Sequence, residues 1–145
     1  MSVPNPVTRL PVLRPVPIFR GLSKVALLQV ARKSTEVAYP KGTTVVREGD
    51  PGDSLCVIAE GTVEVRRDDR AVAQLTVGDF FGEISLFDGE PRSATVVAVD
   101  DVVLLRLSSS DFDSLLDVPY VARAALKGLA TRFREQQALH GPHCM

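Results

Sequence analysis

Residues 40–65 read "PKGTTVVREGDPGDSLCVIAEGTVEV" and combine short apolar runs with Gly, Pro and Asp at close intervals. Within this stretch Val63 and Val65 alternate with polar Glu64, as in a strand that has one face inward and the other in water. The Gly, Pro and Asp clusters between the runs are turn formers. Short strands separated by explicit turns are typical of a β-sandwich or barrel. The stretch therefore predicts a fold that is mainly β.

The same two-residue period extends outward from this stretch over residues 35–107. The expected strands are 35–39, 43–47, 54–60, 62–67, 70–76, 93–99 and 102–107. Helical spacing appears on both sides of them. Ser23 is a candidate N-cap for a helix that ends near Lys33, Ser108 and Asp111 resemble a capping box, and Pro119 stands near the first turn of a last helix.

The N-terminal segment is rich in proline, and each proline removes a backbone donor. The prolines of residues 1–17 are Pro4, Pro6, Pro11, Pro15 and Pro17. We expect residues 1–17 to form an extended or turn-like arm that resembles a linker. The folded domain is then expected over 18–137, with a flexible tail over 138–145.

Composition limits the classes of protein that this chain can belong to. Its 145 residues, 45% apolar and 24% charged, suit one globular domain with its own core. No run approaches the roughly 18 apolar residues of a membrane span, and the N-terminus lacks the pattern of a secretory signal, so a cytoplasmic location is expected. The net charge of −1 argues against broad nucleic-acid binding.

The cysteines and histidines point to neither a metal site nor catalysis. Cys56 lies in an apolar run and is expected to be a small buried residue, unpaired with Cys144. The group His140 to Cys144, at the chain end, lacks a fourth ligand, so no metal site is expected. Both histidines lie in this tail, and no nucleophile is paired with a base, so we do not expect an enzyme.

Residues 81–95, "FGEISLFDGEPRSAT", hold a different kind of pattern. Gly82 would let a ligand approach the backbone, a helical turn at 84–87 would offer N–H groups to an anion, and Arg92 presents forked donors that match a phosphate. Glu83 would repel a phosphate unless the ligand also carries a donor, such as a sugar hydroxyl. On residue types alone, a solvated or mutually paired Glu83 and Arg92 remains the open alternative.

This segment closely resembles the phosphate-binding cassette of the cyclic nucleotide-binding domain family, which includes the catabolite activator protein, regulatory subunits of cyclic-AMP-dependent kinase and cyclic nucleotide-gated channels. The resemblance covers roughly residues 16–137. Residues 40–65 resemble the glycine pattern of the family's β-roll, and "PIFRGLS" at 17–23 resembles its entry into the first helix. The expected fold is an eight-stranded β-roll of the double-stranded β-helix or jelly-roll type, mainly β with flanking α, with an N-terminal helix, a short cassette helix and C-terminal helices.

The resemblance also implies roles for individual residues. Glu83 would accept the ribose 2′-hydroxyl, the Gly82 backbone would lie beside the same sugar, and Arg92 would hold the cyclic phosphate. Backbone N–H groups near the phosphate would come from the positions around Ser85, Ser93 and Ala94. The full set of implied ligand-binding residues is Gly82, Glu83, Ile84, Ser85, Arg92, Ser93 and Ala94.

The base of the nucleotide would lie against the inner face of the strands around Val63, Val65 and Leu75. Arg132 and Phe133 lie where the last helix could cap it, although a solvated arginine and a core phenylalanine explain them equally well. The hydroxyl of Ser93 suits a guanine amino group, but serine at this position is also common among cyclic AMP binders. Cyclic AMP is the expected ligand, with cyclic GMP second and no cofactor.

The resemblance implies a regulatory or sensor domain without a catalytic step, which passes ligand binding on by moving the segment 108–137. Its partners would be the nucleotide, an unknown effector protein or output domain, and a second copy in a homodimer. Because the sequence ends at Met145, no DNA binding is expected from this chain alone. The alternatives are a regulatory domain of a larger channel or enzyme, a degenerate interaction module that binds no nucleotide, and a cupin-like metalloenzyme, which would need histidines inside the barrel.

Overall fold

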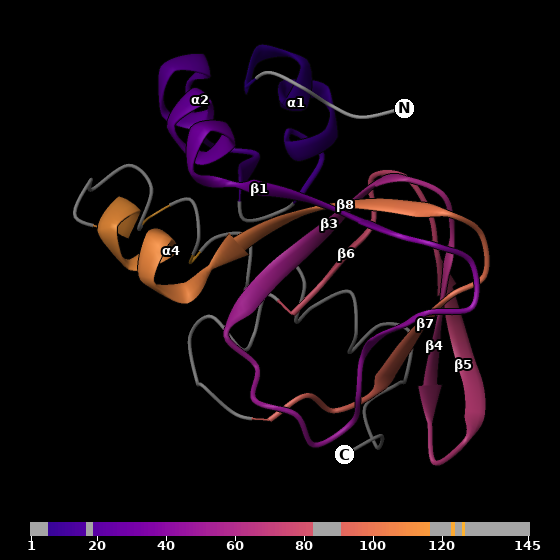
Figure 1. The fold of residues 1–145 in the computed structure, drawn as a ribbon. Coiled ribbons are helices and arrows are strands. Elements are labelled where there is room, and N and C mark those ends of the chain that lie inside the picture. The colour runs from indigo at the N-terminus through magenta and orange to yellow at the C-terminus, as the bar shows by residue number, and fades with distance from the viewer. Residues whose placement is uncertain (1–5, 17–18, 83–90, 117–122, 124–125, 127–145) are drawn as a thin grey trace, which may run out of the picture.

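The computed structural model describes residues 6–16, 19–82, 91–116, 123 and 126. Within them, eight strands form two four-stranded antiparallel sheets (Figure 1). Sheet I has the order β1-β8-β3-β6 and sheet II the order β2-β7-β4-β5. The strands are β1 (Thr35–Tyr39), β2 (Thr44–Val46), β3 (Ser54–Glu60), β4 (Val63–Arg67), β5 (Arg70–Leu75), β6 (Phe80–Phe81), β7 (Thr95–Ala98) and β8 (Val102–Ser108). The helices whose bounds are described are α1 (Pro6–Leu13), α2 (Lys24–Lys33) and α4 (Ser109–Leu116).

The two faces of β3 belong to two different hydrophobic clusters, which explains its continuous apolar sequence. Cys56 and Ile58 point between the sheets, into a cluster with residues of both. Its buried members are Cys56, Ile58, Val63, Val96, Ala98, Val102 and Leu104. Leu55 and Val57 point to the other side, where α1 and α2 cover sheet I (Figure 1).

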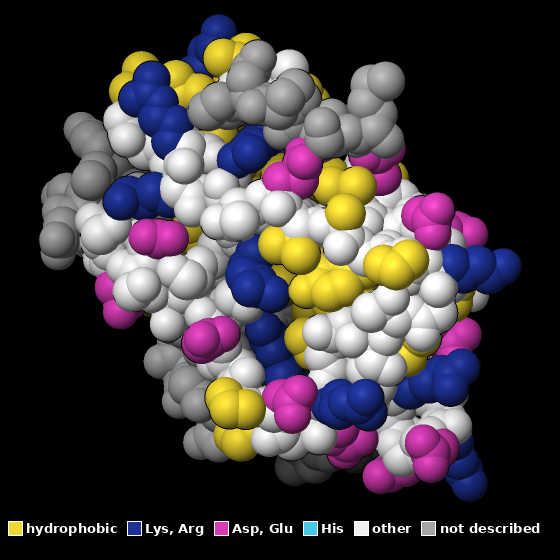
Figure 2. Space-filling view, in the orientation of Figure 1, with side chains coloured by type: hydrophobic (Ala, Val, Ile, Leu, Met, Phe, Trp, Pro, Cys, Tyr) yellow, Lys and Arg dark blue, Asp and Glu magenta, His cyan; other side chains and the backbone are white. Residues whose placement is uncertain are grey.

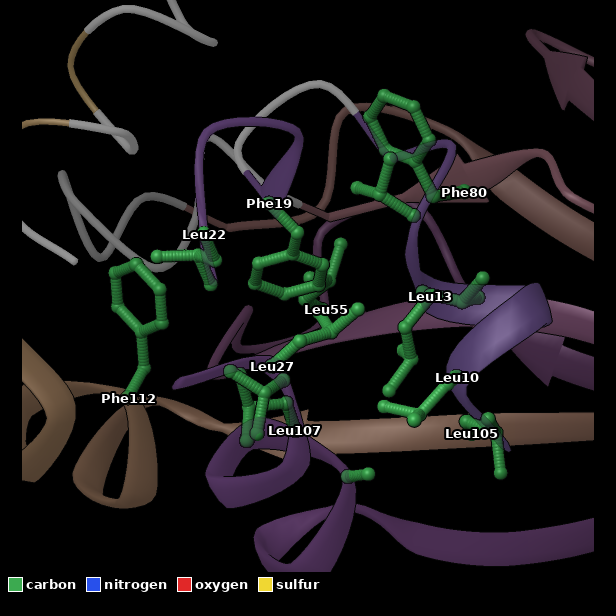
Figure 3. Packing of buried hydrophobic residues seen from close by; sticks show 14 of the residues in the cluster. Leu10, Leu13, Phe19, Leu22, Leu27, Leu55, Phe80, Leu105, Leu107 and Phe112 are labelled. Atoms are coloured by element: carbon green, nitrogen blue, oxygen red, sulfur yellow. The ribbon is translucent and has the colours of Figure 1, made fainter. Parts of the chain in front are cut away.

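The helix-side cluster ties α1, α2 and α4 to sheet I. Figure 3 shows its larger side chains, which come from α1, α2, α4, the strands and the segment between α1 and α2. Phe19, Leu27 and Phe112 are each 1% exposed or less. Burying a side chain of this size stabilises the fold by roughly 1.5–3 kcal/mol. No described helix has the length and apolar character that a membrane span requires.

Both predicted helix caps are confirmed. Ser23 Oγ accepts a hydrogen bond from the Ala26 N–H at 3.1 Å and so begins α2. Ser108 Oγ accepts from the Asp111 N–H at 3.2 Å and so begins α4. Each cap satisfies an amide that would otherwise have no partner in the first helical turn.

The extended or turn-like conformation predicted for the N-terminal arm is wrong for residues 6–13, which form α1. Pro6 is tolerated at the first helical position, where its missing N–H costs nothing. Pro11 disfavours the helix, because it has no N–H to donate to the carbonyl four residues earlier. Leu10 and Leu13 compensate by entering the helix-side cluster, and such packing supplies most of the stability of a short helix. The proposed boundary at residue 18 stays a prediction.

The predicted fold class is confirmed, and so are most of the strands. β1 and β3 have the predicted bounds, and the other predicted strands differ by one or two residues at their ends. The sequence interpretation did not place β6, because two residues are too short to show a period. The cassette helix expected at 84–87 and the helix expected after Pro119 lie outside the described residues or mostly so.

Two positions on α2 test the orientation of this helix. Leu27 is 0% exposed and Val25 is 72% exposed. We predict that Leu27→Ala lowers the free energy of unfolding by about 2–5 kcal/mol, because it leaves a cavity in the helix-side cluster. Val25→Ala, the matched control, should change it by about 0.5 kcal/mol or less. Equal effects in urea unfolding would contradict the placement of α2.

Candidate functional site

Arg92 lies just before β7 of sheet II, but its side chain extends into the protein and is bound by sheet I. The residue is only 7% exposed. Its Nη2 donates to the Ser54 carbonyl oxygen at 3.0 Å and to Ser54 Oγ at 3.1 Å. Ser54 is itself buried and begins β3. The guanidinium group therefore joins the beginning of β3 to the segment that leads into β7.

The backbone of Arg92 is fixed as firmly as its side chain. Its N–H donates to the Asp50 carbonyl at 2.8 Å, and its carbonyl accepts from the Gly49 N–H at 2.8 Å. These bonds attach Arg92 to the turn between β2 and β3. The turn is closed in part by Asp50 itself, whose carboxylate accepts from the Arg47 N–H. Arg92 is thus held on both sides of its Cα and at one end of its side chain.

Gly82 gives Arg92 the space that it needs. It directly follows β6 and has a φ of +88°, a conformation that other residues rarely adopt. A Cβ atom at this position would overlap Arg92 Nη1 and the Ser54 carbonyl oxygen. The preceding ring of Phe81 lies 6.0 Å from Arg92 Cζ, within the range of a cation–π contact. Gly82, Ser54, Phe81 and Arg92 therefore form one contiguous cluster.

Two donors of the Arg92 guanidinium group have no acceptor among the described residues. Nε and Nη1 are buried and make no hydrogen bond there. Buried polar groups are nearly always hydrogen-bonded, and a buried charge costs more than a neutral group when it is left without a partner. An arginine with one nitrogen anchored and two further nitrogens without an acceptor can offer charge-assisted hydrogen bonds to an oxyanion.

Cys56 lies close to this cluster but is not a reactive group. It is 3% exposed, as the sequence predicted. Burial raises the pKa of the Cys56 thiol, and the positive charges of Arg92 and Arg106 lower it only in part. The thiol therefore stays neutral near pH 7, as for an apolar core residue. Among the described residues, no three His, Cys, Asp or Glu side chains are grouped to hold a metal ion.

The three residues predicted to line the base share one side of sheet II. Val63 is fully buried between the sheets, and Val65 and Leu75 are partly buried and pack against the same cluster. Val63 and Leu75 are cross-strand partners on β4 and β5. Figure 2 shows hydrophobic side chains reaching the surface near the middle of one face, with Lys and Arg side chains beside them.

The structure thus brings together Gly82 and Arg92 of the predicted phosphate site. Ser93 is exposed and Ala94 half-buried in the chain that continues from Arg92 to β7. The predicted residues Glu83, Ile84, Ser85, Arg132 and Phe133 lie outside the described residues. Sequence reasoning missed Ser54 and Phe81. The one available signal for Ser54 was a hydroxyl residue at the start of a buried apolar strand.

Comparisons with known proteins identify the family of this chain. The family model described as the cyclic nucleotide-binding domain matches residues 36–118. A cyclic nucleotide-gated potassium channel of Rhizobium etli is 42% identical over 69% of this chain and 28% of its own length. A CRP-like cAMP-activated global transcriptional regulator of Mycobacterium tuberculosis is 35% identical over 81% of this chain and 55% of its own length. The chain therefore spans about half or less of these relatives.

Solved structures share the same architecture. The N-terminal domain of a transcriptional regulator from Streptomyces coelicolor superimposes with a TM-score of 0.79 at 38% sequence identity, covering 88% of this chain and 93% of that one. The match of the family model, the identities to these relatives and the shared β-roll lead to one conclusion. The chain belongs to the cyclic nucleotide-binding domain family.

Proposed function

We propose that this domain is a sensor that binds cyclic AMP, with cyclic GMP as the second candidate, and that Arg92 holds the cyclic phosphate. The observation that supports this most directly is the buried guanidinium group of Arg92, whose Nε and Nη1 have no acceptor among the described residues. A singly charged cyclic phosphate supplies both the charge and the oxygen acceptors that these donors require.

The nitrogen atoms of Arg92 have different proposed roles, which follow from their contacts. Nη2 is occupied by Ser54, which leaves the N–H groups of Nε and Nη1 for the phosphate. A hydrogen bond to a charged group contributes roughly 1.5–3 kcal/mol. Two such bonds, with contacts to the sugar and base, suffice for micromolar binding after the entropic cost of association.

The remaining contacts complete the proposed site. Glu83 accepts the ribose 2′-hydroxyl, beside the Gly82 backbone. The backbone at Ile84, Ser85, Ser93 and Ala94 surrounds the phosphate. The base lies against Val63, Val65 and Leu75, whose shared position on sheet II supports this placement. Arg132 and Phe133 cap the base, and Ser93 decides how well guanine is accepted.

The proposed output is movement of the segment 108–137 over the bound nucleotide, with no catalytic step. A ligand shifts such an equilibrium only if it binds the two conformations with different affinity. An effector protein or output domain, or a second copy in a homodimer, would sense the movement. Since the chain spans 28% of a channel relative and 55% of a regulator relative, a role as the regulatory part of a longer protein is the second candidate. The cytoplasmic location stays a prediction.

Isothermal titration with cyclic AMP and cyclic GMP tests the proposed site. We predict that Arg92→Ala weakens cyclic AMP binding at least about a hundredfold, because the positive charge and its charge-assisted bonds to the phosphate are lost. Arg14→Ala, which removes an exposed arginine from the turn after α1, should leave the affinity unchanged. If the wild type bound neither nucleotide at millimolar concentration, the sensor function would be wrong. If Arg92→Ala bound as tightly as wild type, the phosphate would be held elsewhere.

Two glycines with nearly the same φ make it possible to distinguish the cost of an unfavourable backbone conformation from the cost of a steric clash with Arg92. Gly82 and Gly78 have φ values of +88° and +92°, but a Cβ atom at Gly78 meets nothing within 4 Å. Either change to alanine should cost about 1–3 kcal/mol of stability for the unfavourable backbone. Gly82→Ala should in addition displace Arg92 and weaken cyclic AMP binding at least about tenfold. Equal affinities of the two variants, measured by titration, would show that Gly82 does not shape the site.

A further inference from the structure

We propose that Ser54 is the positioning residue of Arg92, and that the peptide unit between Asp53 and Ser54 connects the phosphate site to the start of α4. The proposal rests on the proposed function, because it concerns how Arg92 is oriented for its ligand. It adds a residue that lies outside the segment 81–95 and that belongs to a central strand of sheet I.

Ser54 can orient Arg92 because Ser54 itself cannot move easily. It is 4% exposed and begins β3, which lies between β8 and β6 in sheet I. Both of its oxygen atoms accept from the same nitrogen, Nη2, at 3.0 Å and 3.1 Å. Fixing Nη2 in this way also fixes the plane of the guanidinium group, and therefore the direction in which Nε and Nη1 point.

The carbonyl of Asp53 belongs to the same peptide unit as the Ser54 nitrogen. This carbonyl faces the start of α4. It accepts a hydrogen bond from the Ser109 N–H at 2.7 Å, and Ser109 is the first residue of α4. Ser54 also pairs with Ser108, the residue whose Oγ caps α4. A peptide unit is rigid and planar, so a displacement of Ser54 is passed to the acceptor of the Ser109 amide.

The simpler explanation is that Ser54 only satisfies a buried cation, and the chain contains a matched case for comparison. Arg9 Nη1 donates to the Ser34 carbonyl at 2.8 Å and to Ser34 Oγ at 3.2 Å. Ser34 is 6% exposed and ends α2, away from Gly82 and Arg92 in the sequence and bonded to neither of them. Two buried serines therefore each bind one arginine through both oxygens, but only Ser54 binds the arginine of the proposed phosphate site.

The experiment compares Ser54→Ala with the control Ser34→Ala in the full chain, using titration with cyclic AMP. Ser54→Ala should weaken binding about tenfold, because Arg92 keeps the carbonyl contact but loses the hydroxyl contact. Ser34→Ala should bind as wild type does. Ser54→Thr keeps the hydroxyl and should restore most of the affinity, whereas a role in packing alone would not be rescued in this way.

The second readout is exchange of the Ser109 amide hydrogen, followed by NMR with and without cyclic AMP. Ligand should slow this exchange in wild type and in Ser34→Ala, and clearly less in Ser54→Ala. If Ser54→Ala bound cyclic AMP as tightly as Ser34→Ala, the positioning role would be overturned, even if Ser54→Thr failed to fold. An unchanged ligand response of Ser109 in Ser54→Ala would overturn the connection to α4. No binding by the wild type would instead overturn the proposed function, and this inference with it.

Discussion

The hydrogen bonds from Arg92 Nη2 to Ser54 are the interaction on which the proposed site depends. They join the segment before β7 in sheet II to the first residue of β3 in sheet I. Without them the guanidinium group would have no described acceptor that fixes its plane. With them, the position of two further donors is set by the β-roll before any ligand arrives. Preorganisation of this kind reduces the entropy that binding must overcome.

Burying the charged side chain of Arg92 destabilises the fold, and several neighbouring residues reduce this effect. A buried arginine needs acceptors, which Ser54 supplies, and the aromatic ring of Phe81 adds a favourable contact. It also needs space, which is available because Gly82 has no side chain. The backbone bonds from Arg92 to Gly49 and Asp50 then hold the turn between β2 and β3 against the site. Contacts of the Arg92 side chain and backbone thus connect three other segments: residues 49–50, Ser54 and residues 81–82.

Much of the fold could be predicted from the sequence because its signals are local. Period-two alternation and apolar runs bounded by turn residues identified seven of the strands, and Ser23 and Ser108 identified the starts of α2 and α4. The helix α1 was missed because Pro11 argues against a helix, whereas burial of Leu10 and Leu13 is a tertiary effect that no local pattern contains. β6 was missed because two residues carry no period.

The site residues also differ in whether a local sequence pattern could identify them. Gly82 and Arg92 could be identified from their spacing within one segment, and they do lie together. Ser54 is 38 residues from Arg92 in the sequence, and only the pairing of β3 with β6 and β8 brings it to the site. No composition or spacing rule connects a serine at the start of one strand with an arginine before another. Contacts of this kind require the assembled sheets.

A crystal structure of the domain with cyclic AMP would test most directly whether Arg92 is the phosphate ligand. We predict that a phosphate oxygen lies within about 2.7–2.9 Å of Arg92 Nε or Nη1, the range of charge-assisted bonds, while Nη2 keeps its bonds to Ser54. A cyclic phosphate bound away from these two nitrogens, or a complex in which Arg92 has left Ser54, would contradict the proposed site.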